Sequence, residues 1–571
     1  SDYGSKVALV SKSLLGKAHT VMAEGGVAAA LGNADQRDNW KVHFRDTIRG
    51  SKNLANWEMA KIHAENAPER VRELERWGAV FDRTVEGKIS QRNFGGHRYP
   101  RLAHVGDRTG LEIIRTLQDY AVHTENLDIF MECTVCDILK SNDRAVGALA
   151  YYRSSGKLVV FKAGSVILAT GGIGKAYRVT SNSWEYTGDG HALAYLAGAD
   201  LIDMEFVQFH PTGMVWPPSV KGTLVTEGVR GEGGILVNSE GERFMFNYIP
   251  EVFAAETAKS EEEANAWLKG EEGAMRPPEL LTRDVVARAI MTEVKEGRGS
   301  PHGGAFLDIA SRQSPDYIKR KLPSMYHQFK ELATLDITEE PMEVGPTTHY
   351  MMGGVRVDAA TAASTVSGLF AAGEAAAGMH GANRLGGNSL SDLLVFGKIA
   401  GQSASNYSQE NSKIAPHGSE IDESIKKALE PFEKGAENPY HIHQELQEIM
   451  EEHVGIVRTG EDIENGIEKL EKLKNRLPNL HSKGGREYNP GWHLCLDLHN
   501  MIITSLALAK AALERTESRG AHTRLDHPEY DEEMGKVNIV IRPSPDGMSV
   551  VKTPLQEMPS ELKEYVLKEA V

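Results

Sequence analysis

The sequence predicts an α/β plus α protein built on a discontinuous, doubly wound parallel sheet of the Rossmann-like kind. Uninterrupted runs of apolar and β-branched residues at positions 6–10, 166–169 and 368–372 are typical of buried parallel strands. Each run leads into a turn of small or glycine residues, where such sheets bind ligands. Beyond residue 406 the apolar positions recur at helical spacing, which indicates a helical part near the C-terminus.

Length and charge narrow the class of protein. The 571 residues exceed what one hydrophobic core organises, so several domains are expected. The formal net charge of −16 repels phosphate backbones and anionic lipid headgroups, which argues against nucleic acid and against direct lipid binding. No run of about 18 apolar residues occurs and no signal segment opens the chain, so we expect no direct membrane span.

Three cysteines are too few for a disulfide framework in a chain of this length, which favours a reducing compartment. Cys133 and Cys136 form C-T-V-C, a spacing that invites a redox interpretation. The surrounding IFMECTVCDIL reads as a strand, in which an odd offset places the two thiols on opposite faces. A structural role is therefore favoured. No metal site is predicted, since each iron–sulfur cluster needs four thiolates.

His19 lies in the loop SKSLLGKAHTVMAEGG, directly after the first predicted strand. No apolar period surrounds it, so a loop laid against a ligand fits better than a core histidine, and a solvated loop histidine is the alternative. The sequence A-H-T-V followed by A-x-G-G resembles the flavoprotein subunit of the succinate dehydrogenase and fumarate reductase family, most like actinobacterial-type succinate dehydrogenases. In that family the loop histidine carries the 8α bond to FAD. The resemblance therefore implies covalent FAD on His19.

The resemblance extends almost to the last residue and implies further FAD contacts. A-T-G-G at 169–172 turns after a strand, Asp189 opens an alanine-rich helix, and Glu374 looks like the family's ribityl-hydroxyl acceptor. An N-cap role alone is the alternative for Asp189. The G-x-G-x-x-G turn of FAD-binding domains is missing before residue 6, so the sequence is expected to be incomplete at its N-terminus. The implied FAD-binding residues are His19, Ser11, Lys12, Ser13, Ala18, Thr20, Ala23, Gly25, Gly26, Ala169, Thr170, Gly171, Gly172, Asp189, Glu374, Arg384, Ser389 and Leu390.

Oxidising a dicarboxylate across its central C–C bond requires donors at both carboxylates, a hydride acceptor at one carbon and a base at the other. Five segments, at 209–213, 226–234, 283–288, 348–354 and 380–389, offer such groups. Singly, each also fits a surface ion pair, a satisfied loop histidine or a flexible turn. Their family order and spacing imply substrate binding by His210, Thr226, His349 and Arg384, and proton transfer by Arg283, Glu227 and Arg230.

An arginine is an unusual base because guanidinium pKa values exceed about 12. The role is feasible if the proton moves along Arg283, Glu227 and Arg230 without a long-lived neutral arginine. Many members of the family have cysteine before the arginine of T-E-G-x-R, whereas this chain has Val229. Phe94-Gly95-Gly96 also matches a family segment near the flavin, although the stretch after it is shorter than in many members.

The predicted domains are an FAD-binding domain, an inserted α+β capping domain, a helical domain and a small β-containing C-terminal domain. Apolar stripes within residues 421–432 and 463–477 are interpreted as the core of the helical domain. The predicted boundaries are 1–205 with 345–406 for FAD binding, 206–344 for the capping domain, 407–522 for the helical domain and 523–571 for the C-terminal domain.

The resemblance implies a succinate dehydrogenase (quinone), the catalytic subunit of respiratory complex II in the tricarboxylic acid cycle and electron transport. Succinate would lose hydride to covalently bound FAD and become fumarate. Fumarate reductase, working in the reverse direction, is the close alternative. L-aspartate oxidase is disfavoured because its flavin is not covalently attached. A catalytically silent electron-relay scaffold is disfavoured because it gains little from a buried cationic pocket.

The implied partners follow from the same resemblance. Electrons would pass to an iron–sulfur subunit, then through membrane anchor subunits to a quinone. Iron–sulfur clusters, and haem where the complex carries it, would lie in those partners only. The chain would be peripheral to the bacterial cell membrane on its cytoplasmic side. The segment RTESRGAH, residues 515–522, is expected to face the iron–sulfur subunit.

Overall fold

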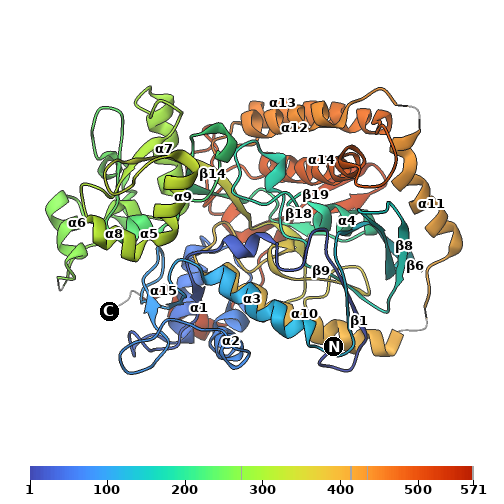
Figure 1. Ribbon diagram of the computed structural model, residues 1–571, viewed down its shortest axis with the longest axis horizontal. Helices are drawn as coiled ribbons and strands as arrows, with labels where there is room; N and C mark the ends of the chain where they lie inside the picture. The colour runs from blue at the N-terminus through green and yellow to red at the C-terminus, as the bar shows by residue number, and fades with distance from the viewer. Residues whose placement is uncertain (272, 412–413, 434, 569–571) are drawn as a thin grey trace.

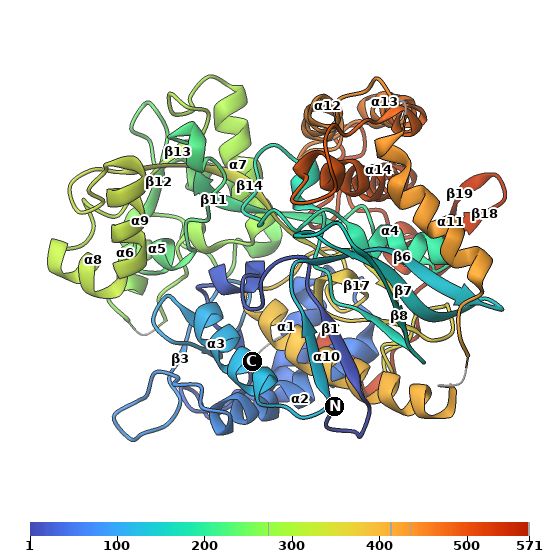
Figure 2. The ribbon, with the colours of Figure 1, turned by 45° about the vertical axis from the view of Figure 1, so that its right-hand side comes forward.

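The computed structural model describes residues 1–568 except 272, 412–413 and 434. Figures 1 and 2 show the segment from about residue 206 to residue 344, drawn in green, as a lobe at one side of the molecule. The N-terminal segments, in blue, lie beside it, and the C-terminal helices, in orange and red, pack on another side.

Two pairs of parallel strands lie at positions predicted for the doubly wound sheet, and each pair forms a sheet of its own. One pair joins residues 166–168 to residues 369–371, which are far apart in the chain, as a discontinuous domain requires. The prediction that the first strands are fully buried is wrong: Leu9 is 36% and Ile167 is 42% exposed. Each of these sheets has only two strands in the described part of the chain, so part of its surface stays uncovered. The pairs are β1 (Val7–Val10) with β5 (Leu127–Phe130), and β9 (Val166–Leu168) with β16 (Leu369–Ala371).

Two helices lie between residues 40 and 76, and their starts have a local cause. The side chain of Asn39 accepts hydrogen bonds from the first free backbone N–H groups of one helix, and Asn56 does the same for the next. A buried cluster joins the second of these helices to the small sheet β2–β4–β3, and the first helix packs on the second through another cluster. The elements are α1 (Trp40–Gly50), α2 (Trp57–Arg76), α3 (Thr109–Val122), α10 (Asn388–Asn411), β2 (Val27–Ala28), β3 (Gln91–Arg92) and β4 (Leu102–Ala103).

The lobe between residues 206 and 344 contains an antiparallel sheet in the order β11–β14–β13–β12. Its buried apolar residues form a cluster of their own, drawn from residues 214 to 344. The two longest strands, β11 and β14, are irregular, with a register shift between Gln208 and Phe209. The elements are β11 (Val207–Met214), β12 (Ile235–Val237), β13 (Ala305–Asp308), β14 (Met342–Met351), α5 (Gly228–Gly231), α6 (Glu261–Leu268), α7 (Arg283–Lys295), α8 (Pro315–Lys321) and α9 (Pro323–Ala333).

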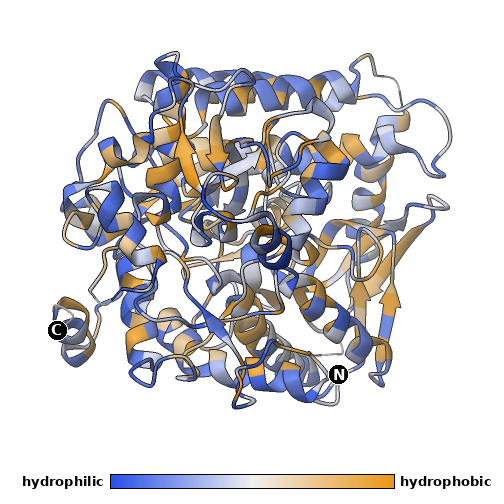
Figure 3. Ribbon diagram, turned by 60° about the vertical axis from the view of Figure 1, so that its left-hand side comes forward, coloured by the Kyte–Doolittle hydropathy of each residue, from blue (hydrophilic) through white to orange (hydrophobic). Residues whose placement is uncertain are grey.

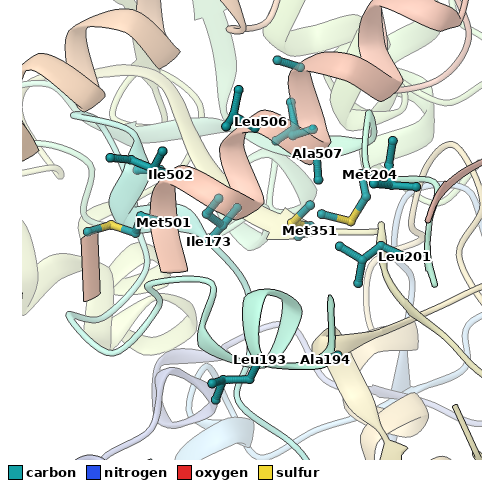
Figure 4. Packing of buried hydrophobic residues seen from close by; sticks show 14 of the residues in the cluster. Ile173, Leu193, Ala194, Leu201, Met204, Met351, Met501, Ile502, Leu506 and Ala507 are labelled. Atoms are coloured by element: carbon teal, nitrogen blue, oxygen red, sulfur yellow. The ribbon is translucent and has the colours of Figure 1, made fainter. Parts of the chain in front are cut away.

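The predicted helical part is present, and its core is continuous with that of the first domain. Figure 4 shows Leu506 and Ala507 of the long helix α14 packed near Met204 and Met351. Among the described residues one helix, α14, is long and apolar enough to cross a membrane, yet 72% of that stretch is buried inside the protein. It is therefore accounted for as a core helix. The helices are α11 (Gly418–Leu429), α12 (Pro439–His453), α13 (Gly460–Arg476), α14 (Pro490–Glu514) and α15 (Ser560–Leu567).

The remaining strands form two sheets beside α4. In one, a bulge between Val135 and Asp137 leaves Cys136 out of the pairing register, and all three cysteines are free thiols. In Figure 3, hydrophobic residues colour much of the strands, and hydrophilic residues colour many of the loops and helix faces at the outside. These elements are α4 (Asp189–Ala197), β6 (Cys133–Ser141), β7 (Arg144–Tyr152), β8 (Leu158–Lys162), β10 (Leu201–Ile202), β15 (Gly354–Arg356), β17 (Ala376–Ala377), β18 (Val537–Ser544) and β19 (Gly547–Pro554).

Candidate functional site

His19 begins a short 3₁₀ turn after β1, and its ring is partly buried. The ring centroid lies 5.3 Å from that of Tyr186 and 6.1 Å from that of His349. Burial lowers the pKa of His19 to about 4, so the imidazole is neutral at pH 7. Its Nδ1 is buried and has no hydrogen-bond partner. A neutral ring with an unengaged nitrogen fits a point of attachment to a cofactor.

Two of the predicted glycines approach neighbouring groups too closely for a side chain. A Cβ on Gly171, whose φ is +72°, would lie 2.7 Å from the Tyr186 ring, and one on Gly172 would collide with the Glu374 carboxyl group. Oε1 of Glu374 accepts a hydrogen bond from the Met351 N–H at 2.9 Å. Burial raises the pKa of Glu374 to about 7. These residues converge beside His19 and fit the flavin that the resemblance implies.

Lys12 and Asp189, both predicted to bind cofactor, meet in a buried ion-pair cluster. The Lys12 ammonium lies 2.9 Å from Asp189 Oδ2 and 2.6 Å from Asp497 Oδ1. Burial alone would lower the pKa of Lys12, but the two carboxylates outweigh it and raise the pKa. The N-cap of α4 is Gly188, and Asp189 is the first helical residue, so the N-cap alternative is wrong. Both of its carboxylate oxygens accept hydrogen bonds from protein side chains.

The other predicted cofactor residues lie in the turn at 169–172, at the start of α10 and in the loop around His19. Thr170 accepts a hydrogen bond from the Gly190 N–H at 3.0 Å, which links the A-T-G-G turn to the start of α4. Ser389 accepts one from Arg384 at 2.7 Å, and Leu390 follows it in α10. Gly25 and Gly26 lead into β2. The loop residues before them are exposed or partly buried: Ser11, Ser13, Ala18, Thr20 and Ala23.

Two arginines predicted from separate segments meet at one amide. Oε1 of Gln208 accepts a hydrogen bond from Arg283 Nη1 at 3.2 Å and another from Arg384 Nη2 at 2.9 Å. The Gln208 side chain is fully buried, and its Nε2 donates to Asn383 Oδ1 and to the Arg384 carbonyl. Burial and the nearby Arg283 charge lower the pKa of Arg384 to about 9. The result is a buried cationic cluster that would attract a dianion.

The residues of the predicted proton path lie next to one another: Arg283 donates a hydrogen bond to Glu227, whereas Arg230 Nη2 forms an ion pair with Glu227 but no hydrogen bond. Arg283 Nε lies 3.3 Å from Glu227 Oε2, and Arg230 Nη2 lies 3.9 Å from the same oxygen. Burial opposes ionisation of Glu227, but the charges of Arg230 and Arg283 outweigh it and lower its pKa. The other oxygen of Glu227 accepts the Gly95 N–H at 3.2 Å. Burial lowers the pKa of Arg230, whose Nη1 donates to the Glu279 carbonyl.

The predicted substrate-binding histidines lie next to each other. The rings of His210 and His349 are 5.2 Å apart, and burial lowers the pKa of both well below the usual value. His210 Nδ1 lies 2.9 Å from the Thr212 carbonyl oxygen, and His349 Nδ1 lies 2.9 Å from Ser181 Oγ. Both rings are therefore neutral at pH 7 and each is fixed through one nitrogen. Thr226 is buried beside Glu227.

Sequence reasoning missed several residues of the site. Gln208 precedes the predicted 209–213 segment and carries no pattern of its own, and Asp497 lies in a stretch interpreted only as helical core. Phe94, which the resemblance had placed near the flavin, packs against Gly25 and Gly386, and a Cβ added to either glycine would collide with its ring. The residue between Ala23 and Gly25, Glu24, is a buried carboxyl group near Thr226.

The fold and these residues define a class: a flavin-dependent oxidoreductase with a pocket for an anionic substrate. Residues 1–390 match the family described as FAD binding domain, and residues 443–565 match the one described as fumarate reductase flavoprotein C-term. The chain belongs to the succinate dehydrogenase and fumarate reductase flavoprotein family.

Several relatives match nearly the whole chain. It is 43% identical over 522 residues to a fumarate reductase (CoM/CoB) subunit of Methanothermobacter marburgensis, covering 91% of this chain and 90% of that one. It is 36% identical over 557 residues to the succinate dehydrogenase flavoprotein subunit of Rickettsia bellii, covering 93% and 88%. Among solved structures, Mycobacterium smegmatis Sdh1 in complex with UQ1 has 54% identity and a TM-score of 0.84, covering 98% and 91%. E. coli quinol fumarate reductase FrdA has 32% identity and a TM-score of 0.88, covering 97% and 93%.

Proposed function

We propose that this chain is the catalytic subunit of a respiratory complex II that oxidises succinate to fumarate. The observation that carries the proposal is the pocket in which Arg283 and Arg384 share one amide oxygen of Gln208 beside two neutral histidines. Two guanidinium groups and two imidazoles suit a small dicarboxylate better than a monoanion. The similarity to succinate dehydrogenase flavoprotein subunits supports the same substrate.

In this proposal the chain's residues bind, orient and deprotonate the substrate. Arg384, His210, His349 and Thr226 bind its two carboxylates and hold the central C–C bond in place. Bound FAD, held by His19 and the residues around Glu374, would supply the two-electron acceptor. One central carbon of succinate would lose a hydride. Arg283 takes a proton from the other central carbon.

The proton leaves Arg283 through the Glu227 carboxylate, 3.3 Å from Arg283 Nε, and then through Arg230. A guanidinium cation can take up a proton only as it gives up another, so Arg283 passes an N–H proton to the ionised Glu227 as it receives one from the substrate, and Glu227 passes a proton to Arg230 as Arg230 releases one outward. Fumarate reduction uses the same residues in reverse, so one pocket serves both directions.

An anaerobic titration tests the substrate and the direction. The purified holoenzyme is titrated with succinate and then with fumarate while the flavin absorption band is recorded. We expect succinate to bleach the band and fumarate to restore it. Fumarate reductase is the alternative because one similar relative carries that name, and it predicts slow bleaching by succinate and fast reoxidation by fumarate. A flavin that responds to L-aspartate and not to succinate would contradict the proposal.

We also propose that His19 binds FAD covalently, because its neutral ring has an unengaged buried nitrogen. Denatured, acid-precipitated protein should then keep flavin fluorescence on its gel band, and His19→Ser should lose it. A native protein whose flavin separates completely on denaturation would contradict covalent attachment.

We propose that electrons leave through other subunits. Among the described residues, no group of three or more His, Cys, Asp or Glu side chains could hold a metal ion. We propose that the partners are membrane anchor subunits and an iron–sulfur subunit, that a quinone is the final acceptor, and that the chain is peripheral to the bacterial membrane on its cytoplasmic side. The isolated chain should reduce dyes slowly and quinone not at all, and co-purified partners should restore quinone reduction. Full quinone reductase activity by this chain alone would refute the partnership.

A further inference from the structure

Asn383 is a buried amide for which the proposed reaction has no use so far, and it lies directly behind the two arginines of the cationic cluster. It precedes Arg384 in the chain and is 2% exposed. Its Oδ1 accepts a hydrogen bond from Gln208 Nε2 at 3.0 Å. Its Nδ2 donates to the carbonyl oxygen of Gly50, the last residue of α1, at 3.2 Å. Asn383 therefore ties the side chain that both arginines share to the backbone of a helix.

The direction of each hydrogen bond in this chain of amides is set by its end. The Gly50 carbonyl can only accept, so the NH₂ group of Asn383 must face it, and the Asn383 oxygen must face Gln208. The NH₂ group of Gln208 then points to Asn383 and to the Arg384 carbonyl, 2.8 Å away. The Gln208 oxygen is left to face the guanidinium groups of Arg283 and Arg384.

The arrangement of the two arginines depends on this oxygen because their charges repel each other. Burial and then the Arg283 charge lower the pKa of Arg384 to about 9. Gln208 Oε1 is the acceptor that the two groups share, at 3.2 Å from Arg283 and 2.9 Å from Arg384. If the amide turned or shifted, it would present a weaker acceptor, or its NH₂ group, to two cations, and the cations would move apart.

The backbone that carries Asn383 is held from two sides. The Ala382 N–H donates to the Ser51 carbonyl at 3.0 Å, and the Ala382 carbonyl accepts the Ala521 N–H at 2.9 Å. Gly381 has a φ of +51°, and a Cβ there would lie 2.5 Å from a backbone nitrogen of the loop before α2. The turn therefore presents the Asn383 amide at a fixed place, as orientation of a neighbouring side chain requires.

We propose that Asn383 is a positioning residue, which fixes the Gln208 amide so that its one oxygen holds Arg283 and Arg384 together. The first of these arginines serves proton transfer and the second serves binding in the proposed function, on which the inference rests. Loss of the Asn383 amide should therefore lower kcat and dicarboxylate affinity together. A residue that only stabilised the fold would lower stability and leave both quantities unchanged in the folded holoenzyme.

Asn383→Leu tests the proposal, because it keeps a similar volume and removes both hydrogen bonds. In the holoenzyme, the Kd of malonate, a dicarboxylate without the oxidisable central bond, is read from the flavin band. Dye-coupled succinate oxidation gives kcat per bound flavin. Since the shared hydrogen bonds involve charged groups, we expect the Kd to weaken about 10- to 100-fold and kcat to fall about tenfold or more. Values within about threefold of the wild type would overturn the inference.

Asn238 of the capping lobe provides a matched control. It is also 2% exposed, and its Nδ2 donates to Glu293 Oε2 at 2.9 Å while its Oδ1 accepts two backbone N–H groups. Asn238→Leu should lower thermal stability but keep Kd and kcat within about twofold of the wild type. Equal losses of Kd and kcat in both variants would overturn the inference. If Asn383→Leu does not fold with flavin, the smaller polar Asn383→Ser takes its place in every measurement.

A double-mutant cycle with Gln208→Met shows whether Asn383 acts through Gln208. In the Gln208→Met protein, adding Asn383→Leu should change Kd and kcat by less than about twofold, because the oriented oxygen is already lost. Additive losses would overturn the inference.

The thermal midpoints of the same four proteins, measured without ligand, give a readout that needs no dicarboxylate. Asn383→Leu should lower the midpoint by less than half as much in the Gln208→Met background as in the wild type, because the contact between the two amides is then already absent. An equal decrease overturns the inference whatever the activities are. If the wild type binds no malonate, the proposed dicarboxylate function fails instead, and the midpoints still decide whether Asn383 holds Gln208.

Discussion

Replacing Arg283 by lysine separates catalysis from binding. Arg283 donates to Glu227 from Nε and to Gln208 from Nη1, at 3.3 and 3.2 Å. A lysine keeps the positive charge, but its single ammonium group cannot hold both acceptors in the planar geometry of a guanidinium. The proton path is therefore interrupted while the pocket stays cationic.

The size of the effect follows from the role. A positioned acid or base contributes about 10²- to 10⁴-fold, or roughly 3 to 5 kcal/mol of barrier, so kcat of Arg283→Lys should fall by about that factor. Binding should change by less than about tenfold, because Arg384, His210 and His349 still contact the ligand. Dye-coupled kcat and a fumarate titration of the flavin band give the two numbers separately.

A matched control lies on the same helix. Arg288 of α7 is 3.6 Å from Asp284 and contacts Thr523, outside the pocket, so Arg288→Lys should retain nearly normal kcat. If Arg283→Lys kept kcat within about tenfold of the wild type, the assignment of Arg283 as proton acceptor would be wrong. An equal loss in both variants would point to a general defect of the helix.

Three further predictions concern other residues. Arg384→Lys should weaken dicarboxylate binding by about 10- to 100-fold, more than it lowers kcat, since a lysine cannot reproduce the forked contact; a titration that shows unchanged affinity would refute this. Burial and the Arg101 charge lower the pKa of His97 to about 3. Below about pH 6.5 the unfolded chain binds a proton at this histidine and the folded protein does not, so the free energy of unfolding should decrease as the pH drops. In denaturant titrations, His97→Gln should lose less stability than the wild type between pH 7.5 and 5.5. Burial raises the pKa of Cys133 and Cys495 to about 12, and that of Cys136 further, while Val229 puts no thiol at the pocket, so thiol reagents at pH 7.5 should leave native activity intact and react only after denaturation.

Local patterns in the sequence were enough to identify the segments of the site. Three segments were predictable: the loop with His19, the turn at 169–172 and the helix starting at Asp189. Glycines and small residues favour turns through their local backbone conformation, whatever the rest of the fold is. The apolar stripes at 421–432 and 463–477 likewise predicted helices, which are α11 and α13, because helical periodicity is a local property. The domain boundaries stay a prediction, although the separate apolar cluster of residues 214–344 is consistent with one of them.

Only the tertiary structure decided which side chains meet and how they ionise. Gln208 joins Arg283 to Arg384, and Asp497 joins Lys12, across separations that no local pattern encodes. The orientation of Gln208 depends on β11, whose register shifts at that residue. The lowered pKa of His19 and the raised pKa of Glu24 come from burial, which packing of distant segments produces. The sequence by itself determined the chemical groups and their order along the chain. The tertiary packing of distant segments determined which groups are in contact and which are charged.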